Sequence, residues 1–346
     1  MTTALEATPL LADASSVAVD PVRYRVLTGD RPTGPLHLGH YLGTLQNRVR
    51  LQELGVETFV VIADYQVITD RAQPGDVATN VHEIVLDYLA AGLDVERTTI
   101  FAHSAVPALN QLMLPFLALT TVPELQRNPT VKSEAAEAGL SSISGLLLTY
   151  PVHQAADILF CHGNLVPVGQ DQLPHIEQTR LVARRFNERF GPVFAEPQAL
   201  LSESPALLGI DGRKMSKSRG NGVGLRASED ETARLIRRAV TDAERSITYE
   251  PDRRPGVASL LLMGALCAGT SPESLADQLD NGGAAVLKQV VTEAVNEHLR
   301  PLRRRRAELV AEPDVVRSVL ARGAERANAE ADRTLADVHE ALGMRY

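Results

Sequence analysis

The chain has 346 residues, of which 44% are hydrophobic and 23% are charged, so it can bury a sizeable core and is long enough for two domains. No apolar run approaches the roughly eighteen residues of a membrane span, and the first twenty residues lack the basic start of a signal peptide. The formal net charge of −8 argues against unspecific nucleic-acid binding over the whole surface, and we expect a cytoplasmic protein with no membrane contact.

The first part of the chain alternates apolar runs with helical patterns. Short β-rich runs predict strands over 23–29, 57–66 and 98–106. Within the second run, residues 59–63 are apolar without alternation, which is typical of parallel strands buried on both faces. Helical spacing predicts helices over 40–54 and over 79–93, where Gly92 marks the end. This order is typical of a doubly wound α/β domain with a parallel, Rossmann-like nucleotide-binding sheet.

The second part of the chain becomes entirely helical. Residues 145–160 predict a helix that starts near Pro151, and 164–191 predict a strand, a loop and a long helix. Beyond about residue 225 the patterns are helical without β-rich runs, as in 228–240 and 284–310. We therefore predict a flexible N-terminal arm, a nucleotide-binding domain, a connecting loop and an all-helical C-terminal domain, over 1–20, 21–210, 211–224 and 225–346.

Two histidines, His37 and His40, stand one helical turn apart in the glycine-rich stretch RPTGPLHLGHYLG. A metal site would need a third ligand, and the nearby sequence offers no acidic residue or cysteine at a useful spacing. The two cysteines, Cys161 and Cys267, are isolated, so we expect them to serve packing. Packing at a helix start and phosphate binding at a glycine-rich turn both remain open for the histidines.

The stretch KMSKS favours phosphate binding. Only four of the 35 basic residues are lysines, and two of them, Lys214 and Lys217, fall in this stretch. A compact ammonium group on a flexible stem can reach a phosphate where arginine is not an equivalent replacement. A mobile loop that carries two such groups is suited to follow a pyrophosphate as negative charge develops on it.

The stretch TYPVHQAADILF places three polar side chains on one helix face. Tyr150, Gln154 and Asp157 follow the spacing i, i+4, i+7, and Asp157 gives a single strong hydrogen-bond acceptor. An aromatic substrate with one ring donor, an indole N–H or a phenol O–H, would find its partner in this carboxylate. A wrong substrate would leave the carboxylate unpaired.

HLGH and KMSKS resemble the paired signature motifs of class I aminoacyl-tRNA synthetases. The further stretches GLLLTYPVHQAADIL, LVPVGQDQLPHIEQTR and AVTDAERSITY resemble the tryptophanyl members of that class, and the resemblance runs from about residue 23 to the C-terminus. It implies activation of L-tryptophan by ATP with Mg²⁺ and transfer of the aminoacyl group to the 3′ end of tRNA(Trp). It also implies a homodimer whose helical domain contacts the tRNA anticodon.

The resemblance also assigns roles to individual residues, and it implies no metal site in the chain itself. Those expected in catalysis are His37, His40, Lys214, Ser216 and Lys217. Those expected to bind ATP are Arg31, Thr33, Gly39, Lys132, Gly169, Asp171, Lys214, Met215, Ser216 and Lys217. Those expected to form the tryptophan pocket are Leu27, Gln66, Tyr150, Gln154, Asp157, Val166, Val168 and Gln172.

Three alternatives stand beside this interpretation. Tyrosyl-tRNA synthetases share the Tyr-x-x-x-Gln-x-x-Asp pattern, although Leu27 stands where many of them have a tyrosine and the VPVGQDQ and TDAE segments favour tryptophan. A non-catalytic synthetase paralogue could lose the signature motifs, which are intact here. A nucleotidyltransferase would explain HLGH but neither KMSKS nor the helical C-terminal part.

The chain departs from the tryptophanyl pattern at several positions. His40 stands where many tryptophanyl enzymes have Asn, Arg31 where they have Gln, Gln66 where they have His, and Gln154 where they have Met. Because two of these changes lie around the predicted pocket, we hypothesise that tryptophan analogues bind this chain weakly, as in an auxiliary, inhibitor-resistant form. The run Arg303 to Arg306 is our candidate for contact with the tRNA backbone.

Overall fold

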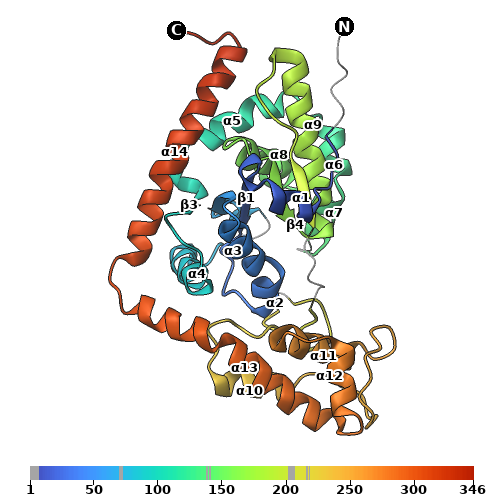
Figure 1. The fold of residues 1–346 in the computed structure, drawn as a ribbon. Coiled ribbons are helices and arrows are strands. Elements are labelled where there is room, and N and C mark those ends of the chain that lie inside the picture. The colour runs from blue at the N-terminus through green and yellow to red at the C-terminus, as the bar shows by residue number, and fades with distance from the viewer. Residues whose placement is uncertain are drawn as a thin grey trace.

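A five-stranded parallel sheet forms the centre of the computed structural model, which describes residues 8–69, 73–137, 139, 142–201, 207–215, 217 and 219–346 (Figure 1). The strand order is β3-β2-β1-β4-β5. Strands are thus added on one side of β1 up to β3 and on its other side from β4 onward, so the topological switch point lies between β1 and β4. This topology confirms the predicted α/β class. The strands are β1 (Arg25–Asp30), β2 (Glu57–Ile62), β3 (Thr98–Ala102), β4 (Leu165–Val168) and β5 (Gln198–Leu201).

Both faces of the sheet are buried. In β2, Val60 and Ile62 join one apolar cluster, whereas Phe59 and Val61 join another on the opposite face. Burial on both faces explains why this strand is apolar without alternation. The helices that flank the sheet are α3 (Gln46–Glu53), α4 (Val77–Ala91), α5 (Ala108–Leu117), α8 (Gly145–Leu159) and α9 (Leu173–Phe190).

The predicted strands at 57–66 and 98–106 are correct in position but too long. Asp64 follows β2 and accepts the Tyr65 N–H, which starts the short 3-10 helix η3 (Tyr65–Ile68). A second 3-10 helix, η4 (His103–Ala105), follows β3 in the same way. These two turns place polar side chains at the carboxyl edge of the sheet.

Two predicted helix starts need correction. Helix α8 begins at Gly145, where the Ser144 hydroxyl accepts the Leu147 N–H, and Pro151 lies inside the helix rather than at its start. The predicted helix 40–54 is preceded by one turn, α2 (Leu38–His40), and passes through a π-helical segment, η2 (Tyr41–Leu45), before α3.

Part of the predicted N-terminal arm is docked on the sheet. Residues 1–7 lie outside the described residues, whereas Leu11 bridges to Ala199 in β5 and α1 (Ala14–Val19) buries Val17. The expectation of a flexible arm is therefore wrong from Leu11 onward. The remaining short elements are η1 (Pro21–Arg23), α6 (Val122–Arg127), α7 (Pro129–Glu137) and η5 (Gln170–Gln172).

Helices alone form the described chain beyond residue 225, as predicted, but the last helix returns to the sheet. In Figure 1, α14 runs along the sheet-containing part while the other four helices form the lower part. A Cβ at Gly323 of α14 would overlap the carbonyl oxygen of Ile100 in β3, so glycine permits this close approach. The predicted boundary near 225 did not anticipate this return. The five helices are α10 (Glu229–Arg237), α11 (Pro255–Ala268), α12 (Pro272–Leu279), α13 (Gly283–Val310) and α14 (Val315–Ala341).

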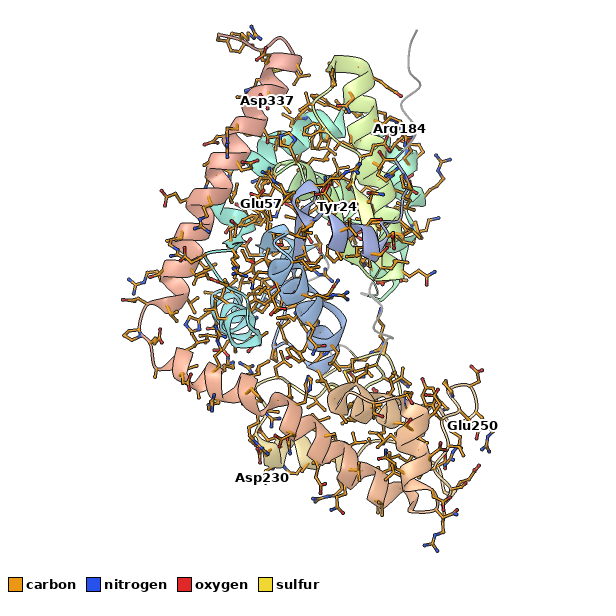
Figure 2. All side chains as sticks on the ribbon, in the orientation of Figure 1. Tyr24, Glu57, Arg184, Asp230, Glu250 and Asp337 are labelled. Atoms are coloured by element: carbon orange, nitrogen blue, oxygen red, sulfur yellow. The ribbon has the colours of Figure 1, made fainter. Side chains whose placement is uncertain are left out.

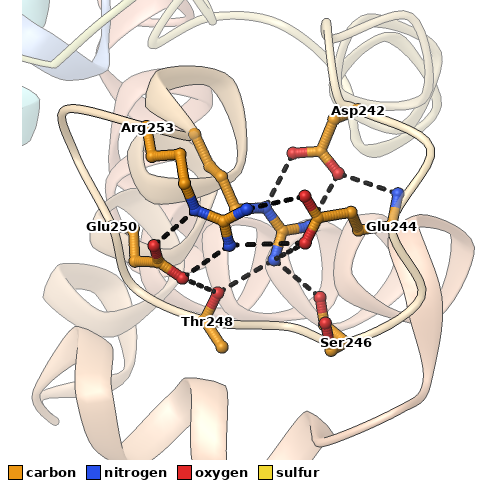
Figure 3. Close-up of polar contacts among 7 residues, drawn as sticks. Asp242, Glu244, Ser246, Thr248, Glu250 and Arg253 are labelled. Atoms are coloured by element: carbon orange, nitrogen blue, oxygen red, sulfur yellow. Dashed lines mark hydrogen bonds and ion pairs between the residues drawn. The ribbon is translucent and has the colours of Figure 1, made fainter.

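The segment that contains TDAE folds around a buried arginine. Arg254 is 3% exposed and donates to both carboxylate oxygens of Asp242, at 2.8 and 2.7 Å, and to the Ser246 carbonyl oxygen at 2.7 Å (Figure 3). The neighbouring Arg253 makes ion pairs with Glu244 and Glu250. This segment therefore has a structural role, holding the loop between α10 and α11.

Charged side chains such as Arg184, Asp230 and Asp337 lie exposed on the outer surface (Figure 2). Among the described residues no single helix is long and apolar enough to cross a membrane. The pair α11 and α12 reaches the necessary length and apolar composition only in combination, with a bend of 107° between the two helices. Both cysteines are free, and Cys161 is buried.

Candidate active site

A cavity of about 300 Å³ opens at the carboxyl ends of β1 and β4, where the strand order changes direction. Ligands of open parallel sheets bind at such switch points. The structure brings together every residue predicted for the tryptophan pocket, since all of them line this cavity. They are Leu27, Gln66, Tyr150, Gln154, Asp157, Val166, Val168 and Gln172.

The acceptor in this cavity is the carboxylate of Asp157. The residue is 2% exposed, and burial followed by the nearby charge of Asp64 raises its pKa well above the usual range. Gln66 Nε2 donates to Asp157 Oδ2 at 3.4 Å. On another wall the Tyr150 hydroxyl lies 3.0 Å from His175 Nε2, which fixes the phenol ring. On this side the cavity thus combines apolar walls with the buried carboxyl group of Asp157.

His37 and His40 form a compact pair at the start of α2. The backbone N–H of His37 donates to His40 Nδ1 at 3.3 Å, and the ring centroids of the two histidines lie 3.8 Å apart. Since Nδ1 accepts, neutral His40 carries its proton on Nε2. Burial lowers the pKa of His37 to about 4 and that of His40 to about 3. Both imidazoles are therefore neutral at physiological pH and would act on a phosphate as N–H donors, not as cations.

The segment after KMSKS pairs directly with HLGH. The Leu38 N–H donates to the Val223 carbonyl oxygen at 2.8 Å, and the Leu225 N–H donates to that of Leu36 at 3.0 Å. A Cβ at Gly39 would lie 3.1 Å from His37 Nδ1 and 3.3 Å from Met215 Sδ, so glycine leaves room where the two motifs meet. The motifs, far apart in the sequence, form one unit in the fold.

The two KMSKS lysines contact two different segments of the chain. Lys217 Nζ donates to the Arg31 carbonyl oxygen at 3.0 Å, and burial lowers its pKa although Asp30 opposes the shift. Lys214 Nζ lies 3.8 Å from Asp171 Oδ2, in an exposed pair. A phosphate chain between these ammonium groups would have a cation at each end. Ser216, predicted to act with them, lies outside the described residues.

Three further residues predicted for ATP differ in position. Gly169 lines the cavity, and Thr33 N–H donates to the Arg31 carbonyl oxygen at 2.9 Å in the turn before HLGH. Lys132 lies exposed on α7. The same helix contributes Glu134 to the cavity, with Oε1 at 3.9 Å from Arg31 Nη2, and the sequence analysis did not single out this residue.

The sequence analysis also missed a buried ion pair at the end of the cavity near Lys217, which we call the phosphate side. Asp30 Oδ2 accepts from Arg48 Nη1 and from the Tyr88 hydroxyl, each at 2.7 Å. Arg48 is 1% exposed and donates to Thr28 Oγ1 at 3.1 Å. Burial would raise the pKa of Asp30, but Arg48 and then Lys217 hold it well below the usual range. The signal in the sequence was a charged residue, Arg48, at a helix position that apolar residues would otherwise fill.

No group of three or more His, Cys, Asp or Glu side chains is arranged to hold a metal ion within the part of the chain that the structure describes. The two signature histidines contact each other, and His40 Nδ1 already accepts a hydrogen bond from the backbone N–H of His37. The described part of the site thus offers N–H donors, ammonium groups and the carboxyl group of Asp157 to its ligands, while that of Asp30 is already paired with Arg48.

Comparison with known proteins agrees with this geometry. Residues 21–300 match the family described as tRNA synthetases class I (W and Y). The tryptophan–tRNA ligase of Treponema pallidum is 43% identical over 327 residues, which cover 92% of this chain and 97% of the relative. Tryptophanyl-tRNA synthetase from Campylobacter jejuni, solved with ADP and tryptophan, superposes with a TM-score of 0.79 at 30% identity, covering 92% of this chain and 99% of the other. The enzyme from Mycoplasma pneumoniae gives 0.80 at 31% identity, covering 92% and 97%.

The buried ion pair predicts how stability depends on pH. In Arg48→Met, Asp30 stays buried without its cation, so we expect a loss of about 3 to 5 kcal/mol in unfolding free energy at neutral pH. The wild-type contribution of Asp30, whose folded pKa is depressed, is present above its unfolded pKa of roughly 3.9 and is lost as the pH falls. In the variant, protonation relieves the buried charge. The difference between the two proteins should therefore narrow as the pH is lowered from about 7 to about 4.

Urea unfolding of both proteins at several pH values measures this difference. Arg184→Met is the matched control, because Arg184 pairs with Glu196 on the exposed side of α9, and its loss should cost less than about 1 kcal/mol. A difference between wild type and Arg48→Met that stays constant over this pH range would contradict the assigned charge of Asp30.

Proposed function

Since the chain belongs to the class I tRNA synthetases of the tryptophan and tyrosine group, we propose that the cavity between β1 and β4 is where it activates L-tryptophan. The reaction is that of a tryptophan–tRNA ligase: ATP and tryptophan give tryptophanyl-adenylate and pyrophosphate, and the aminoacyl group then passes to the 3′ end of tRNA(Trp). The observation that carries the proposed site is the buried carboxyl group of Asp157 inside the cavity, with Lys217 of KMSKS bound to the carbonyl oxygen of Arg31, another lining residue.

Recognition of the amino acid rests on a single directed hydrogen bond. The indole N–H donates to Asp157, and apolar side chains such as Val166 and Leu27 contact the ring faces. A phenol O–H could also donate to Asp157, but Leu27 has no hydroxyl to donate a hydrogen bond to the phenol oxygen in turn. An amino acid without a ring donor leaves a buried carboxyl group unpaired, which excludes it more strongly than a mere loss of shape complementarity.

Activation is an in-line displacement at the α-phosphate of ATP. The carboxylate of tryptophan attacks and forms a new O–P bond, while the bond between the α-phosphorus and the α,β-bridging oxygen of ATP breaks, so that this oxygen leaves with pyrophosphate. Lys217 and Lys214 hold the leaving pyrophosphate, where negative charge accumulates. His40, protonated on Nε2, donates a hydrogen bond to the phosphates without adding a charge that must be desolvated.

Mg²⁺ accompanies ATP as part of the substrate. The described residues hold no carboxylate cage, and Asp30, which lines the cavity, is already bound to Arg48 and Tyr88. Magnesium commonly binds through substrate phosphates and water and needs few protein ligands. This chain's contribution is to hold the phosphate chain whose oxygens carry the ion.

The chain acts as a cytoplasmic homodimer in this proposal. Leu114 and Val122, on the consecutive helices α5 and α6, are 72% and 55% exposed and offer apolar surface to a second subunit. Its substrates ATP, tryptophan and tRNA are all components of cytoplasmic protein synthesis. The helices beyond residue 225 are the part proposed to contact the anticodon.

ATP–pyrophosphate exchange with each amino acid in turn tests the activity. We expect exchange with tryptophan only. Lys217→Ala should lower the rate by about 10² to 10³, because one preorganised cation is lost from the developing charge. The matched control is Lys288→Ala, whose Nζ donates to the Arg237 carbonyl oxygen in the helical part, and it should exchange at the wild-type rate. Exchange with tyrosine only, or with no amino acid, would overturn the proposal.

The altered pocket predicts a change in inhibitor binding. Gln66 Nε2 donates to Asp157 at 3.4 Å, so its side chain competes for the carboxylate that an analogue must use. We expect tryptophan analogues to inhibit wild type weakly and Gln66→His several-fold more strongly. Inhibition constants measured against tryptophan in the exchange reaction decide this. Equal inhibition of wild type and Gln66→His would refute the idea of an inhibitor-resistant form.

Two of the four arginines in the run on α13 remain candidates for contact with tRNA. Arg306 pairs with Glu83 at 2.5 Å and with Asp87 at 2.7 Å, and Arg303 donates to Asn296 and Thr232, so both serve internal contacts. This corrects the expectation that the whole run contacts the tRNA backbone. Arg304 and Arg305 are exposed and remain the proposed phosphate ligands.

Replacing both exposed arginines should weaken tRNA binding through the counterion effect. For the double variant Arg304→Ala, Arg305→Ala we expect the slope of log K against log salt to fall by about two, since each phosphate contact contributes nearly one. The control is the pair Arg317→Ala, Arg322→Ala on exposed positions of α14, which should leave the slope unchanged. An unchanged slope in the first double variant would exclude these residues from the tRNA interface.

A further inference from the structure

A buried polar cluster lies behind the carboxyl group of Asp157. His103 is the first residue of η4 after β3, whereas His153 and Asp157 lie one turn apart on α8. The three residues are 0%, 3% and 2% exposed. The imidazole rings of His103 and His153 have centroids 4.1 Å apart, and the ring of Tyr65 packs edge-on against His103 at 5.5 Å. Neither histidine belongs to the site residues that the sequence predicted.

Two unsatisfied atoms of this cluster face each other. His103 Nδ1 lies 3.3 Å from Asp157 Oδ1, yet among the described residues neither atom has a hydrogen bond of good geometry. The other carboxylate oxygen, Oδ2, accepts from Gln66. Leaving a buried donor and a buried acceptor unpaired is unfavourable, and a small rotation of the imidazole would join them.

We propose that His103 is a positioning residue for tryptophan recognition: its Nδ1–H holds Asp157 Oδ1 and so directs Oδ2 toward the indole N–H. This inference rests on the proposed role of Asp157 as the indole acceptor. Torsion about the last bond of an aspartate side chain is broad, so a carboxylate without a second partner has no fixed direction. A donor on Oδ1 removes that freedom before the substrate arrives, as preorganised sites require.

The protonation of the cluster suits this role. Burial, and then the neighbouring His153, lowers the pKa of His103 to about 3, so its imidazole is neutral and has one N–H to donate. Burial raises the pKa of Asp157, and a hydrogen bond from His103 favours the ionised form that burial opposes. The arrangement supplies a directed acceptor without placing a full positive charge beside the indole.

An analogue without the ring donor separates positioning from packing. In β-(3-benzothienyl)alanine a sulfur atom replaces the indole N–H, so the shape is kept while the hydrogen bond to Asp157 is lost. We use the ratio of kcat/KM for tryptophan to kcat/KM for this analogue in ATP–pyrophosphate exchange. A change that only damages the fold lowers both values together and leaves the ratio unchanged.

Isosteric variants at His103 test the inference. His103→Asn keeps an amide N–H near the position of Nδ1, whereas His103→Leu has the same shape as Asn and no donor. We expect His103→Leu to lower the ratio by about tenfold, the effect of one hydrogen bond to a charged group, and His103→Asn to keep it within about threefold of wild type. His103→Gln places its amide near the position of Nε2, so we expect it to lower the ratio as His103→Leu does. It replaces His103→Leu in the comparison if the leucine variant does not fold.

Two further variants tell the possible failures apart. His153→Leu removes the neighbouring buried imidazole, whose nitrogens make no hydrogen bond to the carboxylate or to any other described residue, and should leave the ratio unchanged. Asp157→Asn should lower the ratio at least as much as His103→Leu. If Asp157→Asn leaves the ratio unchanged, the proposed acceptor is wrong. If Asp157→Asn lowers it but the leucine and glutamine variants of His103 do not, the acceptor stands and the positioning role of His103 is refuted.

Discussion

The buried ion pair between Asp30 and Arg48 is the contact on which the site depends. It joins the end of β1 to α3, and the Tyr88 hydroxyl extends it to α4. Desolvation makes such a pair costly unless hydrogen bonds satisfy its remaining atoms, and here Arg48 also donates to Thr28 and to the Gly29 carbonyl oxygen. The carboxylate then stabilises the buried ammonium group of Lys217, whose pKa burial would otherwise lower further. The fold thereby creates a place for a KMSKS lysine before any phosphate is bound.

Strand β1 connects the two halves of the cavity. Leu27 lines the amino-acid side, while Asp30 and Arg31 at the end of the strand face the phosphate side. A Cβ at Gly29 would overlap the carbonyl oxygen of Val61, so glycine is needed where β1 lies closest to β2. Both substrates of the activation step are therefore positioned from one short strand, and their reacting groups meet where that strand ends.

Local sequence patterns predicted part of this arrangement and could not predict the rest. Strand positions followed from apolar runs such as 59–63, and the spacing of Tyr150, Gln154 and Asp157 placed these side chains in one cavity. Pairings between distant residues left no local pattern: Arg48 of α3 pairs with Asp30 at the end of β1, and His103 in the turn after β3 lies next to Asp157 of α8. The return of α14 to β3 escaped prediction for the same reason, because its amphipathic pattern does not say which surface it covers.

The two buried carboxyl groups of the cavity differ because their neighbours differ. Asp30 has a guanidinium group at 2.7 Å, and its pKa is depressed despite burial, so it is a fixed anion that holds cations in place. Asp157 has no cation beside it among the described residues: it lies next to the neutral His103 imidazole and the Gln66 amide, and burial and then the nearby charge of Asp64 raise its pKa. Environments that separate two carboxyl groups in this way also separate their tasks. A fixed anion near the phosphates organises the lysines, whereas a carboxyl group without a cation beside it is free to accept a neutral N–H from the substrate.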